Sequence, residues 1–314
     1  MKKFHDCSRS SEAPKHNKEN MGPPINDIVL GLRSYCHRFN WGHTNDPEEA
    51  DLIFTNDVYP SSVLEINRPR VKRMDGVYWH KDLVKKNKHL NKAAIQSDSV
   101  IFISNYSMHS YYELYGDKLK YSKVILNCVD DTLFYPINIQ KEENSLVASA
   151  SNWSRPEKRF SDLMEFMSNF ATDYKLNLIG KCDFITPKNV VKHGYIEDSA
   201  VVNRIMNMSE AMVNFSYRDP APKTVCQAIN CRLPLIYAFS GGTPELVKNG
   251  IPILDQTKIQ FESFTPNLKE SCMSRSWKEF KDKKNALISD SKYVKNNFMS
   301  MLHSYFSEFE RVIY

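Results

Sequence analysis

The sequence contains no apolar run of 18 residues, and its first twenty residues carry charge without an apolar core. The first absence argues against a membrane-spanning helix and the second against a secretory signal peptide, so we expect a cytoplasmic protein. The chain also lacks a long basic block or a basic stripe with interleaved aromatic residues, so no nucleic-acid partner is expected. Its net charge of +5 gives a mild attraction for anions and leaves peripheral contact with an anionic membrane surface open.

The seven cysteines are odd in number and scattered, and no two of them form a C-x-x-C pair. This usage fits a reduced, intracellular compartment better than a disulfide framework. The sequence also has no D-x-D motif and no histidine cluster, so we expect neither a bound metal nor a cofactor. It carries no sign of an oligomeric state.

Length and composition are those of an ordinary globular protein of two domains. The chain has 314 residues, of which 41% are hydrophobic and 25% charged. Short apolar runs alternate with segments of helical spacing, which is the pattern of an α/β fold. We expect domains at 1–140 and 141–290, with a polar hinge at 137–144, and an amphipathic final helix within 291–314 that includes Val294.

The stretch 211–247 carries the clearest pattern in the chain. Its two apolar runs, 211–215 and 233–239, have the length of buried strands, and the spacing between them predicts a helix. A Ser-Gly-Gly turn follows, after which Thr243 is expected to cap a new helix with Pro244 at its first position. Strand-to-helix turns at the carboxyl end of a parallel sheet suit a ligand that bears phosphate.

The same stretch resembles the signature of a known family. In chain order, this signature consists of a Glu, seven further residues, a second Glu, a small-residue turn, Leu-Pro, a strand and then Gly-Gly-x-Pro-Glu. It is similar to the retaining nucleotide-sugar glycosyltransferases with the GT-B fold (glycosyltransferase group 1), which include relatives of glycogen synthase and sucrose synthase. Gly241, Gly242, Pro244 and Glu245 match outright, whereas Asp219 and Gln227 replace the two glutamates.

A second segment resembles the end of the first domain in this family. Its matching residues are Asn127, Val129, Asp130, Phe134 and Pro136, and Cys128 stands where the family usually has Gly. The resemblance covers roughly residues 25 to 247. It implies two Rossmann-like domains that face each other across a cleft, with the last helix crossing back onto the first domain.

The resemblance also implies which residues bind the donor. Lys158 stands where the family has a lysine for the diphosphate, and Arg155 could reach the same phosphates. Because prolines reduce the free amides of the turn at 220–222, the expected amide donors are Lys223, Thr224 and Val225. The other expected donor-side residues are Asp219 beside the transferred sugar, Gln227 on the ribose, Tyr195 and Ile196 on the nucleobase, Gly241, Gly242 and Glu245 near the sugar, and Gly22 facing the phosphates.

The expected chemistry follows from charge. Breaking the bond between sugar and diphosphate develops negative charge on the phosphate, which Lys158 and Arg155 would neutralise without a metal. Asp219 would hold hydroxyls or stabilise the positive anomeric carbon. On the acceptor side, Asp75 and His80 are candidates for a base or a hydroxyl-binding group, so Asp219, Lys158 and Asp75 form the expected catalytic set.

Each assignment has an ordinary structural alternative. These are a solvated helix-start lysine for Lys158, a turn residue before proline for Asp219, an exposed helix residue for Gln227, a favourable helix-dipole charge for Glu245, a loop breaker for Gly22 and a structural histidine for His80.

The sequence therefore predicts a metal-independent enzyme that moves a sugar from a nucleoside-diphosphate-sugar to a carbohydrate or glycoconjugate acceptor with retention of configuration. A hydrolase or epimerase of nucleotide-sugars is the competing enzyme. A degenerate module that only binds nucleotide-sugar is the non-enzymatic alternative, motivated by the replacement of both glutamates.

Overall fold

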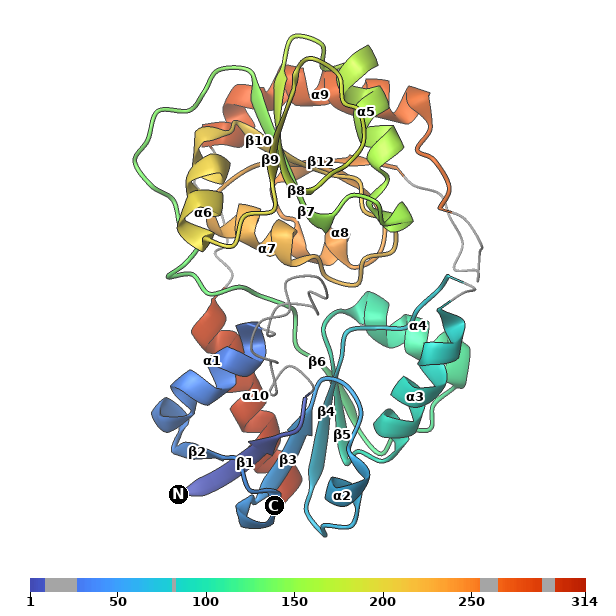
Figure 1. Ribbon diagram of the computed structural model, residues 1–314, viewed down its shortest axis with the longest axis vertical. Coiled ribbons are helices and arrows are strands. Elements are labelled where there is room, and N and C mark those ends of the chain that lie inside the picture. The colour runs from blue at the N-terminus through green and yellow to red at the C-terminus, as the bar shows by residue number, and fades with distance from the viewer. Residues whose placement is uncertain (9–26, 81–82, 255–264, 290–296) are drawn as a thin grey trace. The chain divides into compact units, whose positions relative to one another are not determined.

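The computed structural model describes residues 1–8, 27–80, 83–254, 265–289 and 297–314 (Figure 1). The chain divides into two units, one formed by Met1–Asp130 with Asn297–Tyr314 and the other by Asp131–Asn296. The sequence predicts domain boundaries after residues 140 and 290 instead. Each unit contains a six-stranded sheet whose paired strands all run parallel.

The first unit has the strand order β2-β1-β3-β4-β5-β6. Its strands are β1 (Lys2–Asp6), β2 (Trp41–Thr44), β3 (Leu52–Thr55), β4 (Arg70–Met74), β5 (Ser99–Phe102) and β6 (Ser122–Val124), and its helices are α1 (Asp27–Tyr35), α2 (Ser61–Leu64), α3 (Val84–Ile95), α4 (Asn105–Tyr115) and α10 (Phe298–Ile313), with short 3-10 turns at Cys36–Phe39 and Pro47–Glu49. The order is not sequential, because β1 lies between β2 and β3.

The last helix, α10, belongs to the core of the first unit. Phe306 and Phe309 of α10 pack against Phe4 of β1 and Trp41 of β2, with ring centroids 5.6–6.0 Å apart. The helix forms because apolar side chains recur along one face, and Asn297 caps it by accepting a hydrogen bond from Ser300 N. Val294, which the sequence pattern also includes, lies outside the described residues.

The second unit has the strand order β12-β11-β10-β7-β8-β9. Its strands are β7 (Ser145–Asn152), β8 (Lys175–Lys181), β9 (Val190–Gly194), β10 (Ala211–Asn214), β11 (Leu235–Ala238) and β12 (Gly250–Ile253), and its helices are α5 (Phe160–Asn169), α6 (Ser199–Met208), α7 (Lys223–Asn230), α8 (Thr243–Leu246) and α9 (Glu270–Ser289), with a 3-10 turn at Pro156–Lys158. Later strands are added on both sides of β7 and β10, so the order reverses between these two.

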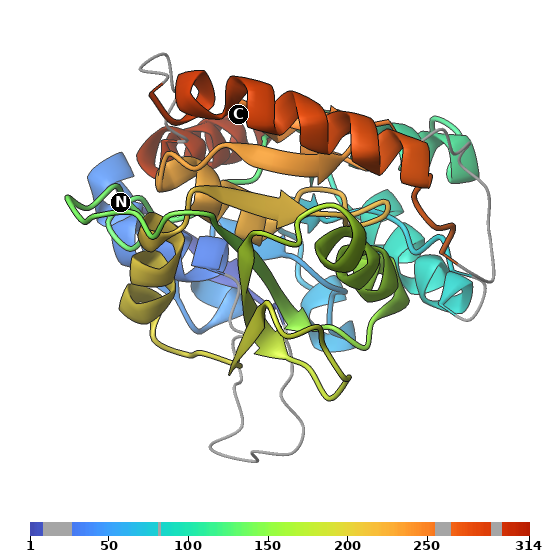
Figure 2. The ribbon, with the colours of Figure 1, turned by 90° about the horizontal axis from the view of Figure 1, so that it is seen from above.

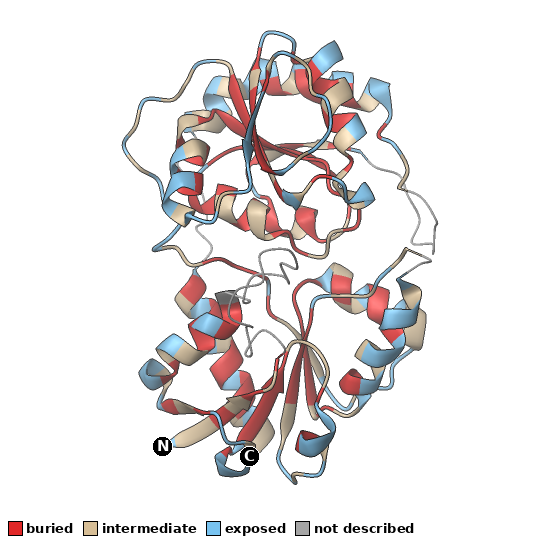
Figure 3. Ribbon diagram, in the orientation of Figure 1, coloured by how far each residue is buried: buried red, intermediate tan, exposed pale blue. Residues whose placement is uncertain are grey.

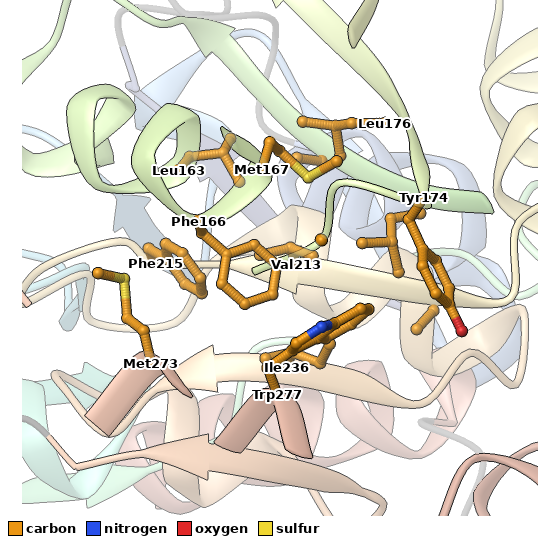
Figure 4. Packing of buried hydrophobic residues seen from close by; sticks show 14 of the residues in the cluster. Leu163, Phe166, Met167, Tyr174, Leu176, Val213, Phe215, Ile236, Met273 and Trp277 are labelled. Carbon is orange, nitrogen blue, oxygen red and sulfur yellow. The ribbon is translucent and has the colours of Figure 1, made fainter. Parts of the chain in front are cut away.

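Helices cover both faces of the second sheet, and its central strands β7, β10 and β11 are largely buried, whereas the edge strand β9 is mostly exposed (Figure 3). Helix α9 lies along the face formed by β11 and β12 (Figure 2). Between sheet and helices, Trp277 of α9 packs edge to face against Phe166 of α5, at 5.3 Å, and against Tyr174, at 4.8 Å (Figure 4). This apolar layer fixes the strands whose carboxyl ends carry the candidate site.

Two expectations for the second unit are wrong in detail. Thr243 does not cap α8, because the helix begins at Thr243 with Gly242 at the capping position, and Thr243 Oγ1 has no partner among the described residues. Pro244 is accordingly the second residue of the helix, where its missing N–H still costs no helical hydrogen bond.

No helix among the described residues is long and apolar enough to cross a bilayer.

Candidate functional site

An ion pair lies at the point where the strand order of the second sheet reverses. Lys158 follows β7 and Asp219 follows β10, and these are the neighbouring strands on either side of the reversal. Lys158 Nζ lies 2.8 Å from Asp219 Oδ2 and 3.5 Å from Ser216 Oγ. The two side chains are 13% and 19% exposed, so both remain within reach of a ligand. In open parallel sheets such a reversal is the usual place for ligand binding.

The backbone holds the two loops of this pair together. Tyr217 N donates a hydrogen bond to Glu157 O at 2.7 Å, which ties the loop after β10 to the 3-10 turn that contains Lys158. Two arginines in the left-handed conformation, Arg159 and Arg218, place their guanidinium carbons 4.6 and 4.8 Å from the buried Tyr217 ring. These contacts fix the residues directly beside Lys158 and Asp219.

The glycine turn after β11 packs against Asp219. Gly242 N donates to Asp219 O at 2.9 Å, and Ser240 Oγ accepts from Arg218 N at 3.0 Å. Gly241 has φ of +64°, and a Cβ at this position would lie 2.2 Å from Asp219 O. Only glycine fits, because both the backbone conformation and the close approach exclude a side chain. The Gly-Gly pair of the motif therefore shapes the loop that presents Asp219.

Helix α7 presents its polar face at this edge of the sheet. Lys223, Thr224 and Gln227 are partly exposed and lie at the helical spacing that brings them to one face. The Gln227 side chain has no hydrogen-bond partner within the described part of the chain. The amide of Val225 donates to Pro222 O at 3.1 Å, so the expectation that it serves a ligand is wrong. The amides expected to bind phosphate thus reduce to those of Lys223 and Thr224.

Other predicted donor residues lie near this edge without joining the ion pair. Arg155, whose side chain is 54% exposed, pairs with Glu157 rather than with Asp219. Glu245 is partly exposed in the first turn of α8. Tyr195 and Ile196 directly follow β9, which β8 separates from β7, and Tyr195 is 41% exposed.

The acceptor-side candidates lie in the first unit. Asp75 directly follows β4 and forms an ion pair with Arg73, a residue that the sequence pattern did not single out. His80 contacts Trp79 edge to face, with ring centroids 5.8 Å apart. Gly22 lies outside the described residues. The described residues contain no group of three or more His, Cys, Asp or Glu side chains that could hold a metal ion.

Sequence reasoning also missed the supporting residues Arg73, Arg159 and Ser216. The sequence could have indicated Arg73, because it stands two positions before Asp75 and alternate residues of a strand share a face. No sequence pattern indicates Arg159 or Ser216, since only the folded loops bring Arg159 to Tyr217 and Ser216 to Lys158.

Solved structures with the same architecture include two that match nearly the whole chain. HepE from Anabaena, solved with UDP and glucose, has a TM-score of 0.68 at 14% identity, and the match covers 99% of each chain. Sucrose-phosphate synthase from Thermosynechococcus elongatus has a TM-score of 0.70 at 14% identity, covering 100% of this chain and 96% of that one. The chain has the GT-B fold.

Sequence comparison finds a curated relative. N-acetyl-alpha-D-glucosaminyl L-malate synthase of Bacillus anthracis is 25% identical over 173 residues, which are 49% of this chain. The match spans 45% of that enzyme's length. No protein-family model matches the chain. The structural and sequence neighbours support the resemblance to group 1 glycosyltransferases that the motifs at 127–136 and 219–245 indicate.

Proposed function

We propose that this GT-B protein is a glycosyltransferase that uses a nucleoside-diphosphate-sugar as donor. The observation that carries the proposal is the Lys158–Asp219 pair at the strand reversal of the second sheet. A cation and a carboxylate 2.8 Å apart offer one group for a diphosphate and one for sugar hydroxyls. HepE, which shares the fold, is solved with UDP and with UDP-glucose.

The chemistry assigns a role to each partner. As the donor bond breaks, negative charge grows on the diphosphate, and Lys158 together with the α7 amides stabilises it. Asp219 holds the sugar and faces the positive charge that develops at its anomeric carbon. Lys158 provides a fixed cation and α7 provides amide dipoles, so the proposed reaction requires no metal.

The finer points of the proposal rest on the family resemblance. The sugar is transferred with retention of configuration, the donor sugar is a hexose, and the acceptor is a hydroxyl of a carbohydrate or glycoconjugate. Gln227 replaces a glutamate at the ribose without loss of hydrogen bonding, since an amide also accepts and donates.

The test is a panel of UDP- and GDP-linked sugars with purified protein, with and without mixed sugar acceptors and with EDTA. Release of nucleoside diphosphate that depends on acceptor and survives EDTA is the expected result. Release without acceptor would replace the proposal with a hydrolase or epimerase. Binding of nucleotide without release from any donor would leave a non-catalytic binding module.

A further inference from the structure

The ion pair between Arg73 and Asp75 in the first unit joins a buried cation to an exposed carboxylate. The Arg73 side chain is 2% exposed and that of Asp75 is 63% exposed. A surface ion pair contributes little to stability, and an ion pair with both partners buried loses hydration energy that its attraction often does not repay. Here the arginine is inside and its partner faces solvent.

Arg73 is held from several sides within the first unit. Its Nη2 donates to Asn127 Oδ1 at 3.4 Å, and its charge acts on Tyr305 of α10. Burying a guanidinium costs several kcal/mol unless partners offset the loss of water. With its position fixed in this way, the arginine determines where the Asp75 carboxylate sits.

The carboxylate keeps one oxygen available. Asp75 Oδ1 accepts from Arg73 Nη1, whereas Oδ2 has no hydrogen-bond partner in the part of the chain that the structure describes. A carboxylate with one oxygen held and one open to solvent can accept a hydrogen bond from a hydroxyl.

The backbone after Asp75 is fixed as well. Asn87 of α3 is fully buried, and its Oδ1 accepts from Tyr78 N while its Nδ2 donates to Tyr78 O, both at 2.7 Å. This double contact holds the segment that follows Asp75 against α3. Side chain and backbone are thus both positioned before any ligand binds, which lowers the cost of binding.

We propose that Asp75 binds a hydroxyl of a carbohydrate acceptor and that Arg73 is the positioning residue that holds it. The carboxylate repels anions and accepts hydrogen bonds from hydroxyls, and the proposed glycosyl transfer supplies a carbohydrate hydroxyl as the reacting group. This inference rests on the proposed function, because only glycosyl transfer makes the site an acceptor site. Binding of a sugar at Asp75 can nevertheless be measured without a donor.

The test is saturation-transfer NMR with the methyl pyranosides of glucose, galactose, mannose and N-acetylglucosamine at millimolar concentration. Asp75→Asn is expected to weaken binding of the recognised glycoside about tenfold or more, because a charged acceptor is lost. Arg73→Lys keeps the charge but loses the two-pronged geometry, and we expect partial weakening. Asp117→Asn, at another exposed aspartate of the same unit, is the matched control.

The double variant separates positioning from mere stability. If Arg73 acts through Asp75, the two changes together weaken sugar binding by less than the product of their separate effects. A general structural effect would be excluded by an unchanged melting temperature of Asp75→Asn and by an unchanged affinity of every variant for the nucleoside diphosphate, UDP or GDP, that the wild type binds. The proposal would be overturned if the effects of the two substitutions on sugar binding were independent. It would also be overturned if Asp75→Asn bound the glycoside as the wild type does, or if the wild type bound none of the glycosides. Sugar binding that depends on Asp75 in a protein with no affinity for UDP or GDP would overturn the proposed function instead.

Discussion

Lys158 Nζ and Asp219 Oδ2 lie 2.8 Å apart, on loops that follow the two strands between which the second sheet reverses its order. In the ligand-free protein the lysine charge is therefore already balanced by a carboxylate. A diphosphate that binds here must compete with Asp219 for the same ammonium group. The two residues are expected to affect nucleotide binding in opposite directions, which makes the site testable by simple substitutions.

Removal of the cation should abolish most of the activity. We expect Lys158→Ala to lower kcat by about 10²- to 10³-fold, the usual effect of losing one group that stabilises transition-state charge. The fold should survive, because the polar partners of Lys158, Asp219 and Ser216, lie in a loop and not in the apolar core. Steady-state release of nucleoside diphosphate measures the effect, with Lys188→Ala at an exposed lysine of the same unit as control. Turnover like that of the wild type would remove Lys158 from the mechanism.

Removal of the carboxylate charge should separate binding from turnover. Asp219→Asn leaves Lys158 without its anionic partner, so we expect UDP and inorganic pyrophosphate both to bind several-fold more tightly. Transfer should fall sharply at the same time, because the amide no longer stabilises positive charge at the sugar. Isothermal titration gives the affinities and acceptor-dependent release gives the turnover. Weaker binding of pyrophosphate by this variant would contradict the competition between diphosphate and Asp219.

The sequence predicted the fold well where one pattern governed a whole element. The buried strands at 211–215 and 233–239, the turn with Gly241 and the final amphipathic helix all follow from local periodicity or backbone demands. Strands β2 and β12 were missed because glycine, proline or polar residues interrupt their apolar residues, so neither Trp41–Thr44 nor Gly250–Ile253 forms a continuous apolar run. The Val225 amide was misassigned because its partner, Pro222 O, depends on the exact start of α7. Contacts such as Arg159 on Tyr217 arise only from tertiary structure.

The ribose contact assigned to Gln227 predicts an effect limited to nucleosides. We expect Gln227→Glu to bind UDP about three- to tenfold more tightly, because a carboxylate accepts stronger hydrogen bonds from two ribose hydroxyls than an amide does. Inorganic pyrophosphate lacks ribose and should bind no better. Titration of both ligands is the measurement. An unchanged affinity for UDP would mean that Gln227 does not face the ribose.

Two glycines of the second unit allow backbone strain to be separated from close packing. Gly194 and Gly241 both have positive φ, +71° and +64°, but only Gly241 has atoms within 4 Å of where a Cβ would be. We expect Gly194→Ala to destabilise by about 1 kcal/mol through strain alone. Gly241→Ala should cost at least about 3 kcal/mol, because the new methyl group meets Asp219 O. Urea denaturation measures both, and equal costs would contradict the close approach.

A buried lysine of the first unit predicts how stability depends on pH. Lys72 of β4 is fully buried and donates a hydrogen bond to Asp57 O. Burial lowers the pKa of Lys72 from its ordinary 10.5 to about 8, against the charges of Asp57 and Asp75, which act to raise it. Between these values the unfolded chain holds a proton that the native protein lacks. The free energy of unfolding contributed by this group therefore rises with pH from about 8 to 10.5, and the gain is lost again as pH falls through that window.

Nearby Cys7 acts in the opposite direction over an overlapping range. Burial raises the pKa of Cys7 from 9.0 to about 12, so the native protein keeps a proton that the unfolded chain gives up, and this contribution to stability falls as pH rises. A single pH profile would mix the two effects, whereas Lys72→Met removes one of them and keeps Cys7. We expect the free energy of unfolding of the wild type, relative to that of Lys72→Met, to rise by about 3 kcal/mol between pH 8 and 10.5. Urea denaturation of both proteins across this range measures the difference. A flat difference would mean that Lys72 keeps its proton in the native state, held by Asp57 O despite its burial.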